Sequence, residues 1–477
     1  MKRITILILL TMFVAACTTP YYPGIDTPVH TQNSQTDRDI IAYIDKRLEE
    51  EYYWLDEVAE RSAQFDREYK KWNEYLPASL SMLKTNMDDG SIKSNGQRTF
   101  YSYITEVSSA TRAETTGFGI LLHYTIILGN KEQNYYYFVI DHVYPDSPAD
   151  KAGIKRGDVI TMINGGYITS SNYSALFGAI QGGTTQNIKL DLLRQTTKES
   201  FSVELSRAHY DVSPVAYHEV IEVSGKRIGY LVYTSFESEY DEELLAALQE
   251  LADGGAEEVI LDLRINRGGS VSSAAMLCSA LMPETLEGGT LCNLVRNPNN
   301  KRTNKSSTFA LEDTGTIFGL DNLTVICSNY SASASELVVM GLRGLNVPVM
   351  LIGSQTEGKN CGMDVTRKTI GNKSLEFAPI TFMCFNAKGE GDWGEGIIPD
   401  INLTDENNRY GLGDANYPMP RADWGDLDHD IALAVAVADI TGQEISTTRH
   451  GAVAESYATM AIDNPALGIR LYADETE

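Results

Sequence analysis

The feature that most restricts the fold is a set of short apolar runs in the second half of the chain. The runs are EEVILDLR (257–264), LTVICS (323–328) and VPVMLIG (347–353). Uninterrupted apolar strands are typical of a parallel sheet that is buried on both faces. Helical patterns at 240–253 and 335–345 precede the first and the third run. This alternation predicts an α/β domain with crossover helices.

The length of 477 residues is too great for one ordinary core, so we expect a multidomain α/β protein. Residues 37–112 place apolar side chains at three- and four-residue spacings, which predicts an N-terminal helical region. Residues 113–207 are rich in β-branched and aromatic residues and predict a β-rich domain. The α/β domain then takes residues 208–440, and the C-terminal tail, 441–477, has no clear structural signal.

The first residues have the pattern of an export signal. A cationic start, MKR, precedes the apolar stretch ITILILLTMFVAA and Cys17. The stretch is too short for an ordinary membrane span, and VAAC resembles the bacterial lipobox, which implies a signal peptide at 1–16 and lipidation of Cys17. A plain secretory signal followed by a chance cysteine is the alternative. With a flexible tether at 17–36, the lipid would anchor the protein to a membrane of the cell envelope, facing the periplasm or the exterior.

The charge balance and the metal-binding residue types narrow the possible partners. The chain has 39 Lys and Arg against 65 Asp and Glu, a net charge of −26, without a basic cluster. A phosphate backbone would be repelled, so no nucleic-acid partner is expected. The seven histidines are scattered and the cysteines form no C-x-x-C pair, so no metal site is predicted.

Three serines alternate in SNYSASASELVVMG (328–341), just before an apolar run. Ser333 and Glu336 fit a capping box, in which both side chains satisfy amides at a helix start. The same strand-to-helix turn would also suit a serine nucleophile beside helical amides. No His lies between 218 and 429 to act as its base. Lys359 in GSQTEGKNCG is the better candidate if burial lowers its pKa, and a solvated loop lysine is the alternative.

A Gly-Gly pair ends one of the apolar strands, in LDLRINRGGS (261–270). Glycine lets a backbone amide approach a reacting carbonyl closely, which suits an oxyanion donor. A convenient strand-to-helix turn explains the pair equally well.

The motifs DLRINRGG, SASASE and GSQTEGK, in that order, resemble the carboxy-terminal processing (tail-specific) serine proteases, over residues 115–402. The resemblance implies a crotonase-like (ClpP/crotonase-type) α/β catalytic domain. It implies that Ser333 is the nucleophile and Lys359 the general base, and that Glu336 supports this dyad. The implied oxyanion donors are two backbone amides, that of Ala334 and that of either Gly268 or Gly269.

The segment SPADKAGIKRGDVITMING (147–165) resembles a PDZ domain, and GFGI resembles its carboxylate-binding loop. In that family the loop binds the C-terminal carboxylate of a peptide, which adds a strand to the domain. A generic glycine-rich β domain is the alternative. The resemblance implies polypeptide partners with apolar C-termini and no metal or organic cofactor. The implied loop residues are Gly117, Phe118, Gly119 and Ile120.

Together these features predict an exported serine endopeptidase that cleaves exported or unfolded polypeptides through an acyl-enzyme. Two departures leave alternatives open: Met363 stands where the family often has Gln, and the interval from serine to lysine is one residue longer. One alternative is a catalytically silent PDZ scaffold that only binds peptides. The other is an acyl-thioester enzyme that uses the Gly-Gly loop as its oxyanion hole.

The cysteines after Cys17 are odd in number, and one pair lies on a predicted hairpin. CGMDVTRK and SLEFAPITFMC flank TIGN. A turn centred near residue 372 places Cys361 opposite Cys384, at about the 4.5 Å Cα separation of a non-hydrogen-bonded pair. We therefore predict a Cys361–Cys384 disulfide that braces the loop of Lys359. The others are expected to be buried apolar residues or to form one further pair: Cys278, Cys292 and Cys327.

Overall fold

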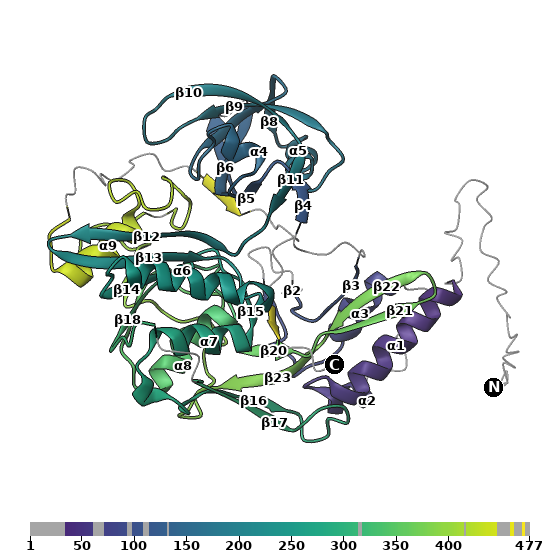
Figure 1. The fold of residues 1–477 in the computed structure, drawn as a ribbon. Coiled ribbons are helices and arrows are strands. Elements are labelled where there is room, and N and C mark those ends of the chain that lie inside the picture. The colour runs from purple at the N-terminus through teal and green to yellow at the C-terminus, as the bar shows by residue number, and fades with distance from the viewer. Residues whose placement is uncertain are drawn as a thin grey trace, which may run out of the picture.

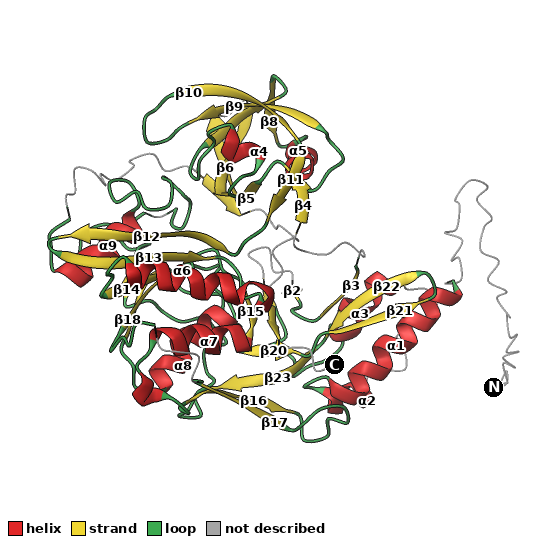
Figure 2. Ribbon diagram, in the orientation of Figure 1, coloured by secondary structure: helices red, strands yellow, loops and turns green. Residues whose placement is uncertain are grey.

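The computed structural model describes residues 34–60, 71–92, 98–107, 114–130, 133–312, 317–414, 416–445, 458–461 and 470–472. They form a mixed α/β fold with several sheets, which confirms the predicted class (Figure 1; Figure 2). The predicted signal peptide, Cys17 and most of the tether lie outside the described residues. No helix within the described ranges is long and apolar enough to cross a membrane.

A mainly parallel sheet forms the centre of the largest part of the molecule. Its strand order is β12-β13-β14-β18-β19-β24, and every neighbouring pair from β13 onward is parallel. The strands are β12 (Val215–Val223), β13 (Lys226–Tyr233), β14 (Glu258–Asp262), β18 (Leu323–Cys327), β19 (Val349–Gly353) and β24 (Ile401–Asn402). Three of them, β14, β18 and β19, are the apolar runs of the sequence.

Helices bury both faces of this sheet. Leu261 and Val325 share one core with α6, α7 and α8, whereas the adjacent residues Ile260 and Ile326 share another with α9. Successive strand residues face opposite sides, so a sheet covered on both faces needs strands without polar alternation. The helices are α6 (Asp241–Asp253), α7 (Val271–Leu281), α8 (Ala334–Gly344) and α9 (Ile431–Thr441).

A second six-stranded sheet has the order β15-β26-β20-β23-β16-β17. Its strands are β15 (Gly268–Ser270), β26 (Arg470–Tyr472), β20 (Cys361–Met363), β23 (Ile380–Phe385), β16 (Thr290–Arg296) and β17 (Ser306–Ala310). The Gly-Gly pair lies in β15, and β20 begins two residues after Lys359. This sheet therefore adjoins two of the three predicted catalytic motifs.

The described N-terminal region contains helices and short strands. Its elements are α1 (Gln35–Glu51), α2 (Leu55–Glu60), α3 (Trp72–Leu80), β1 (Ser91–Ile92), β2 (Arg98–Thr99) and β3 (Tyr103–Glu106). Apolar residues of the helices, such as Ile44 and Leu76, pack in one core with Cys361 and Phe377. In addition, β3 pairs with β22 (Lys373–Ala378), which pairs with β21 (Thr366–Ile370). The N-terminal elements thus brace the chain that follows Lys359.

The β-rich part lies at the top of Figure 1 and is a seven-stranded antiparallel sheet, β10-β9-β7-β8-β6-β5-β25. Its strands are β5 (Ile120–Asn130), β6 (Gln133–Val143), β7 (Val159–Ile163), β8 (Gly166–Thr169), β9 (Asn187–Leu193), β10 (Ser200–Ser206) and β25 (Ala458–Ala461). Two helices and a two-stranded sheet accompany it: α4 (Pro148–Lys151), α5 (Tyr173–Gln181), β4 (Glu114–Gly117) and β11 (Ala208–Asp211). The last strand of the large sheet, β25, comes from the C-terminal tail.

The predicted Cys361–Cys384 disulfide is wrong. The hairpin turns at the predicted place, but Cys361 lies opposite Met383, and an irregularity follows between Gly362 and Met363. A slip of one residue turns a side chain to the other face of a strand. All five cysteines after Cys17 are buried and unbridged, and the Cys361 thiol donates instead to Asp88 O at 3.2 Å.

Alkylation of the unfolded, unreduced protein should therefore modify five thiols, because none is protected in a disulfide. Peptide mass spectrometry locates the labels, which we expect at Cys278, Cys292, Cys327, Cys361 and Cys384. Recovery of a Cys361–Cys384 cross-linked peptide would contradict the register described above.

Candidate active site

Ser333 lies at the turn between β18 and α8, with φ +65° and ψ −112°. Residues with a side chain rarely adopt this region, and such strain clusters at functional sites. The side chain is 1 % exposed, and its hydroxyl has no hydrogen-bond partner among the described residues. By contrast, Ser331 Oγ donates to Leu263 O at 2.7 Å, and Ser335 Oγ donates to Asn266 O at 3.0 Å. Ser333 is thus the one alternating serine whose hydroxyl is uncommitted within the described structure.

The carboxylate of Glu336 joins the start of α8 to the loop of Lys359. Its Oε2 accepts from the amides of Ser333 and Lys359 at 2.7 and 2.9 Å. Its Oε1 accepts from Thr356 Oγ1 at 2.5 Å and from the Gly358 amide at 2.7 Å. Because both amides meet at one oxygen atom, the serine and lysine segments lie side by side. Burial raises the pKa of Glu336 to about 7, and these hydrogen bonds act against that increase.

Lys359 is buried, and its pKa is lowered. It is 1 % exposed, which excludes the alternative of a solvated loop lysine. Burial lowers the pKa of Lys359 to about 8, although the carboxylates of Asp89 and Glu336 act in the opposite direction. Its Nζ lies 5.1 Å from the centre of the Tyr101 ring. A lowered pKa is the condition under which a lysine can accept a proton near neutral pH.

Met363, which stands where the resembling family often has Gln, is fully buried in the core shared with the N-terminal helices. A thioether is at most a weak hydrogen-bond acceptor, so Met363 cannot orient the lysine as an amide would. The lysine loop is instead held through its backbone, by Glu336 and by the Glu357 amide, which donates to Ser331 O at 3.0 Å.

The Gly-Gly pair has positive φ values, +98° at Gly268 and +143° at Gly269. A Cβ on Gly269 would lie 2.0 Å from Phe236 O, so no larger residue fits there. The Gly268 amide donates to Asn266 Oδ1 at 2.8 Å. Phe236 N donates to Gly268 O, and Ser270 N donates to Phe236 O. Since polar groups alternate along a strand, the Gly269 amide faces the opposite side, toward β26.

Asn266 connects the Gly-Gly strand to the turn at Ser333, a contact that the sequence did not indicate. Its backbone oxygen accepts from the Ala332 amide at 3.2 Å and from Ser335 Oγ at 3.0 Å. Its side-chain amide donates to Tyr233 O at 3.0 Å. These bonds place the Gly-Gly pair beside Ala334, the first residue of α8. Asn266 lies within the DLRINRGG motif, but only the fold reveals these partners.

The predicted peptide-binding loop, Gly117–Ile120, joins β4 to β5. Phe118 O accepts from the Ala149 amide at 2.9 Å, and Gly119 O accepts from the Tyr144 amide at 3.0 Å. A Cβ on Gly119 would lie 2.0 Å from the Ser147 side chain. The loop is therefore held closely against α4, and it leads directly into the strand on which β25 pairs.

A buried charged cluster joins the β-rich part to the strand of the Gly-Gly pair. Arg156 Nη1 donates to Ala422 O at 2.7 Å and lies 3.6 Å from Asp430 Oδ2. Arg264, four residues before Gly268, binds the same Asp430 oxygen at 2.8 Å. Both guanidinium groups lie over the Trp424 ring, at 3.8 and 5.2 Å. Sequence patterns had pointed to none of these contacts.

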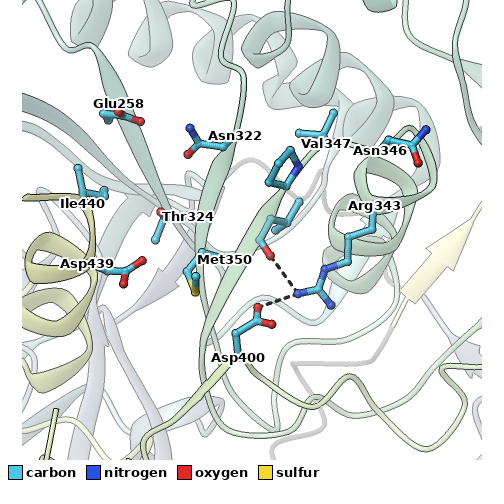
Figure 3. A pocket seen from close by; sticks show the side chains of 12 residues that line it. Glu258, Asn322, Thr324, Arg343, Asn346, Val347, Met350, Asp400, Asp439 and Ile440 are labelled. Atoms are coloured by element: carbon cyan, nitrogen blue, oxygen red, sulfur yellow. Dashed lines mark hydrogen bonds and ion pairs between the residues drawn. The ribbon is translucent and has the colours of Figure 1, made fainter. Parts of the chain in front are cut away.

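A polar pocket lies at the other end of the mainly parallel sheet, and Figure 3 shows its lining. Arg343 crosses it, donating to Val349 O at 3.0 Å and to Asp400 Oδ2 at 2.8 Å. The pocket lies at the amino ends of β14, β18 and β19, whereas Ser333 follows the carboxyl end of β18. Ligands of open α/β sheets bind at the carboxyl ends, which favours the serine site. Among the described residues, no group of three or more His, Cys, Asp or Glu could hold a metal ion.

Glu336→Gln should destabilise the folded protein, because the substitution affects hydrogen bonds as well as removing one charge. The new amide NH₂ would face N–H donors that now bind a carboxylate. We therefore expect the free energy of unfolding to fall by roughly 2–4 kcal/mol. Denaturant unfolding measures this loss. The exposed Glu395→Gln is the matched control and should unfold like the parent; equal stability of both variants would contradict the central role of Glu336.

Two segments of the chain match known protein families. Residues 227–403 match Peptidase family S41, and residues 139–194 match the PDZ domain family. The CtpA-like serine protease of Staphylococcus aureus (strain bovine RF122) is 26 % identical over 257 residues, which cover 54 % of this chain and 48 % of that protein. Its Staphylococcus saprophyticus counterpart is 26 % identical over 278 residues, 56 % and 53 % of the two chains. The chain thus spans about half the length of these curated relatives.

A crystal structure described as an S41 protease from Bacteroides fragilis has a similar fold. It superimposes with a TM-score of 0.66 at 23 % identity, covering 89 % of this chain and 99 % of that one. The matches of residues 139–194 to the PDZ domain and of residues 227–403 to Peptidase family S41 confirm the resemblance to carboxy-terminal processing serine proteases that the motifs indicated.

Proposed function

We propose that this protein is a serine endopeptidase that recognises exported or unfolded polypeptides through their apolar C-termini and cleaves them through an acyl-enzyme. The observation that carries the proposal is the conformation of Ser333, which is strained, buried and without a hydrogen-bond partner for its hydroxyl among the described residues. Glu336 holds the segment of a buried, weakly basic lysine beside it.

In the proposed reaction, Ser333 Oγ attacks the carbonyl carbon of the scissile peptide bond while its proton passes to neutral Lys359 Nζ. The lysine then gives this proton to the leaving amine, and the acyl-enzyme ester remains. A water molecule attacks the ester, passing its proton to Lys359. That proton returns to Ser333 Oγ as the acid product leaves, so the enzyme is restored.

Two backbone amides would stabilise the oxyanion that forms during each attack. Ala334 supplies the first because it begins α8 directly after the nucleophile. Of the two glycines, Gly269 is the better second donor, since the amide of Gly268 is already bonded to Asn266. The crotonase-like type of catalytic domain, implied by the resemblance, belongs to this proposal.

The proposed setting is the cell envelope. The lipobox-like VAAC and the tether support lipidation at Cys17 and attachment to a membrane. The Gly117–Ile120 loop, followed by β5, supports capture of a polypeptide end by strand addition. The S41 and PDZ matches favour a peptidase over the silent scaffold and the acyl-thioester enzyme.

Ser333→Ala should abolish cleavage of an unfolded polypeptide that ends in apolar residues, with a loss of at least about 10³-fold because the nucleophile is gone. Fragments are followed by mass spectrometry. Ser335→Ala is the matched control, and we expect it to keep activity within about tenfold, since its hydroxyl is bonded to Asn266. Cleavage by Ser333→Ala at the parent rate would refute the assignment.

The pH dependence of kcat/KM should report Lys359. Below its pKa of about 8 the lysine is protonated and cannot accept the serine proton, so the rate should rise with pH and level off above about 8. Steady-state cleavage between pH 6 and 9.5 measures the profile. A rate that does not change across this range would contradict a lysine base.

A further inference from the structure

Two short strands from the C-terminal tail lie in the two places where a polypeptide substrate would bind. Figure 1 shows them as yellow arrows, one beside β5 and one beside β15. The first, β25 (Ala458–Ala461), extends the sheet of the PDZ domain. The second, β26 (Arg470–Tyr472), lies between β15 and β20. The segment that had no clear signal in the sequence thus contacts both proposed substrate sites.

The position of β25 matches that of a peptide added to a PDZ sheet. Without it, β5 would be the edge strand of the seven-stranded sheet. The two strands are antiparallel, with Ala458 opposite Ile127 and Ala461 opposite Tyr124. The tail therefore runs toward the Ile120 end of β5, where the Gly117–Ile120 loop lies. This is the binding mode in which backbone hydrogen bonds hold a peptide on a sheet edge.

The position of β26 covers the proposed oxyanion strand. It is parallel to β15, with Arg470 opposite Gly268 and Leu471 opposite Gly269. On its other edge, Tyr472 lies opposite Met363 of β20, the strand that follows the lysine loop. The amide of Gly269 faces this side, so β26 lies where an incoming carbonyl would need that donor.

We infer that the C-terminal tail is an internal competitor that covers the peptide-binding edge of β5 and the Gly-Gly strand until a polypeptide end displaces it. The inference rests on the proposed function, because it assigns these two surfaces to substrate. A tethered segment competes at an effective concentration in the millimolar range, so a free peptide binds only to the fraction of molecules whose tail is displaced. Release of the tail should therefore raise both peptide affinity and cleavage.

Peptide binding is tested first, in full-length protein carrying Ser333→Ala, so that no cleavage is needed. Adding Thr459→Pro removes an amide donor from β25 and disfavours the strand, whereas the matched Thr459→Ala keeps the backbone amide. Fluorescence anisotropy with a labelled peptide that ends in apolar residues measures affinity. We expect Thr459→Pro to bind at least about tenfold more tightly than Thr459→Ala.

Cleavage is tested in the Ser333 background with Thr459→Pro and Leu471→Pro against Thr459→Ala and Leu471→Ala. Each proline should raise kcat/KM at least about tenfold over its alanine control. A synthetic peptide with the sequence of residues 458–472 should then inhibit the proline variants. Circular dichroism and thermal unfolding establish that the variants are folded.

The outcomes separate the two proposals. Equal affinities and equal cleavage in every proline and alanine pair would overturn the tail inference and leave the peptidase intact. If no variant cleaves but Thr459→Pro still binds peptide more tightly, the proposed function fails and the tail remains a competitor on β5. Unfolding of both proline variants would overturn the inference, because β25 and β26 would then be structural members of their sheets.

Discussion

The active site depends on one buried carboxylate. Glu336 receives four hydrogen bonds, one from the turn at Ser333 and three from the loop that carries Lys359. A buried carboxylate is tolerated only where its acceptor capacity is used, so the two segments and the acid stabilise one another. The strained backbone of Ser333 persists because its surroundings hold it from both sides. The backbones of Ser333 and Lys359 are therefore positioned by the same carboxylate, that of Glu336.

The lowered pKa of Lys359 depends on elements outside residues 227–403, the segment that matches the peptidase family. Burial is the main cause, and part of the covering surface comes from the N-terminal region, through Tyr101. Asp89 stabilises that region by accepting from Tyr52 Oη and from the amides of Tyr101 and Ser102. The N-terminal region thus helps to bury Lys359, and burial is what lowers the pKa of this lysine.

The cluster around Asp430 joins the PDZ domain to the chain segment that leads to the Gly-Gly pair. Arg156 of the PDZ domain and Arg264 near the Gly-Gly strand bind the same carboxylate and lie over the same indole. Burial raises the pKa of Asp430, whereas the positive charges of Arg264 and Arg156 lower it. The net effect is a lowered pKa. The tail strands β25 and β26 connect the same two parts of the molecule by backbone pairing.

The amino-acid sequence by itself determined the element types of the mainly parallel sheet and its helices, and the loops that carry Ser333, Lys359 and the Gly-Gly pair. These features follow from side-chain periodicity and from glycine, which report on the local backbone. Only the tertiary structure decided which serine hydroxyl is uncommitted, how far burial lowers the pKa of Lys359, and that Cys361 faces Met383 instead of Cys384. It alone placed β25 and β26 on the two proposed substrate sites, because pairing between distant segments leaves no periodic signal in either one.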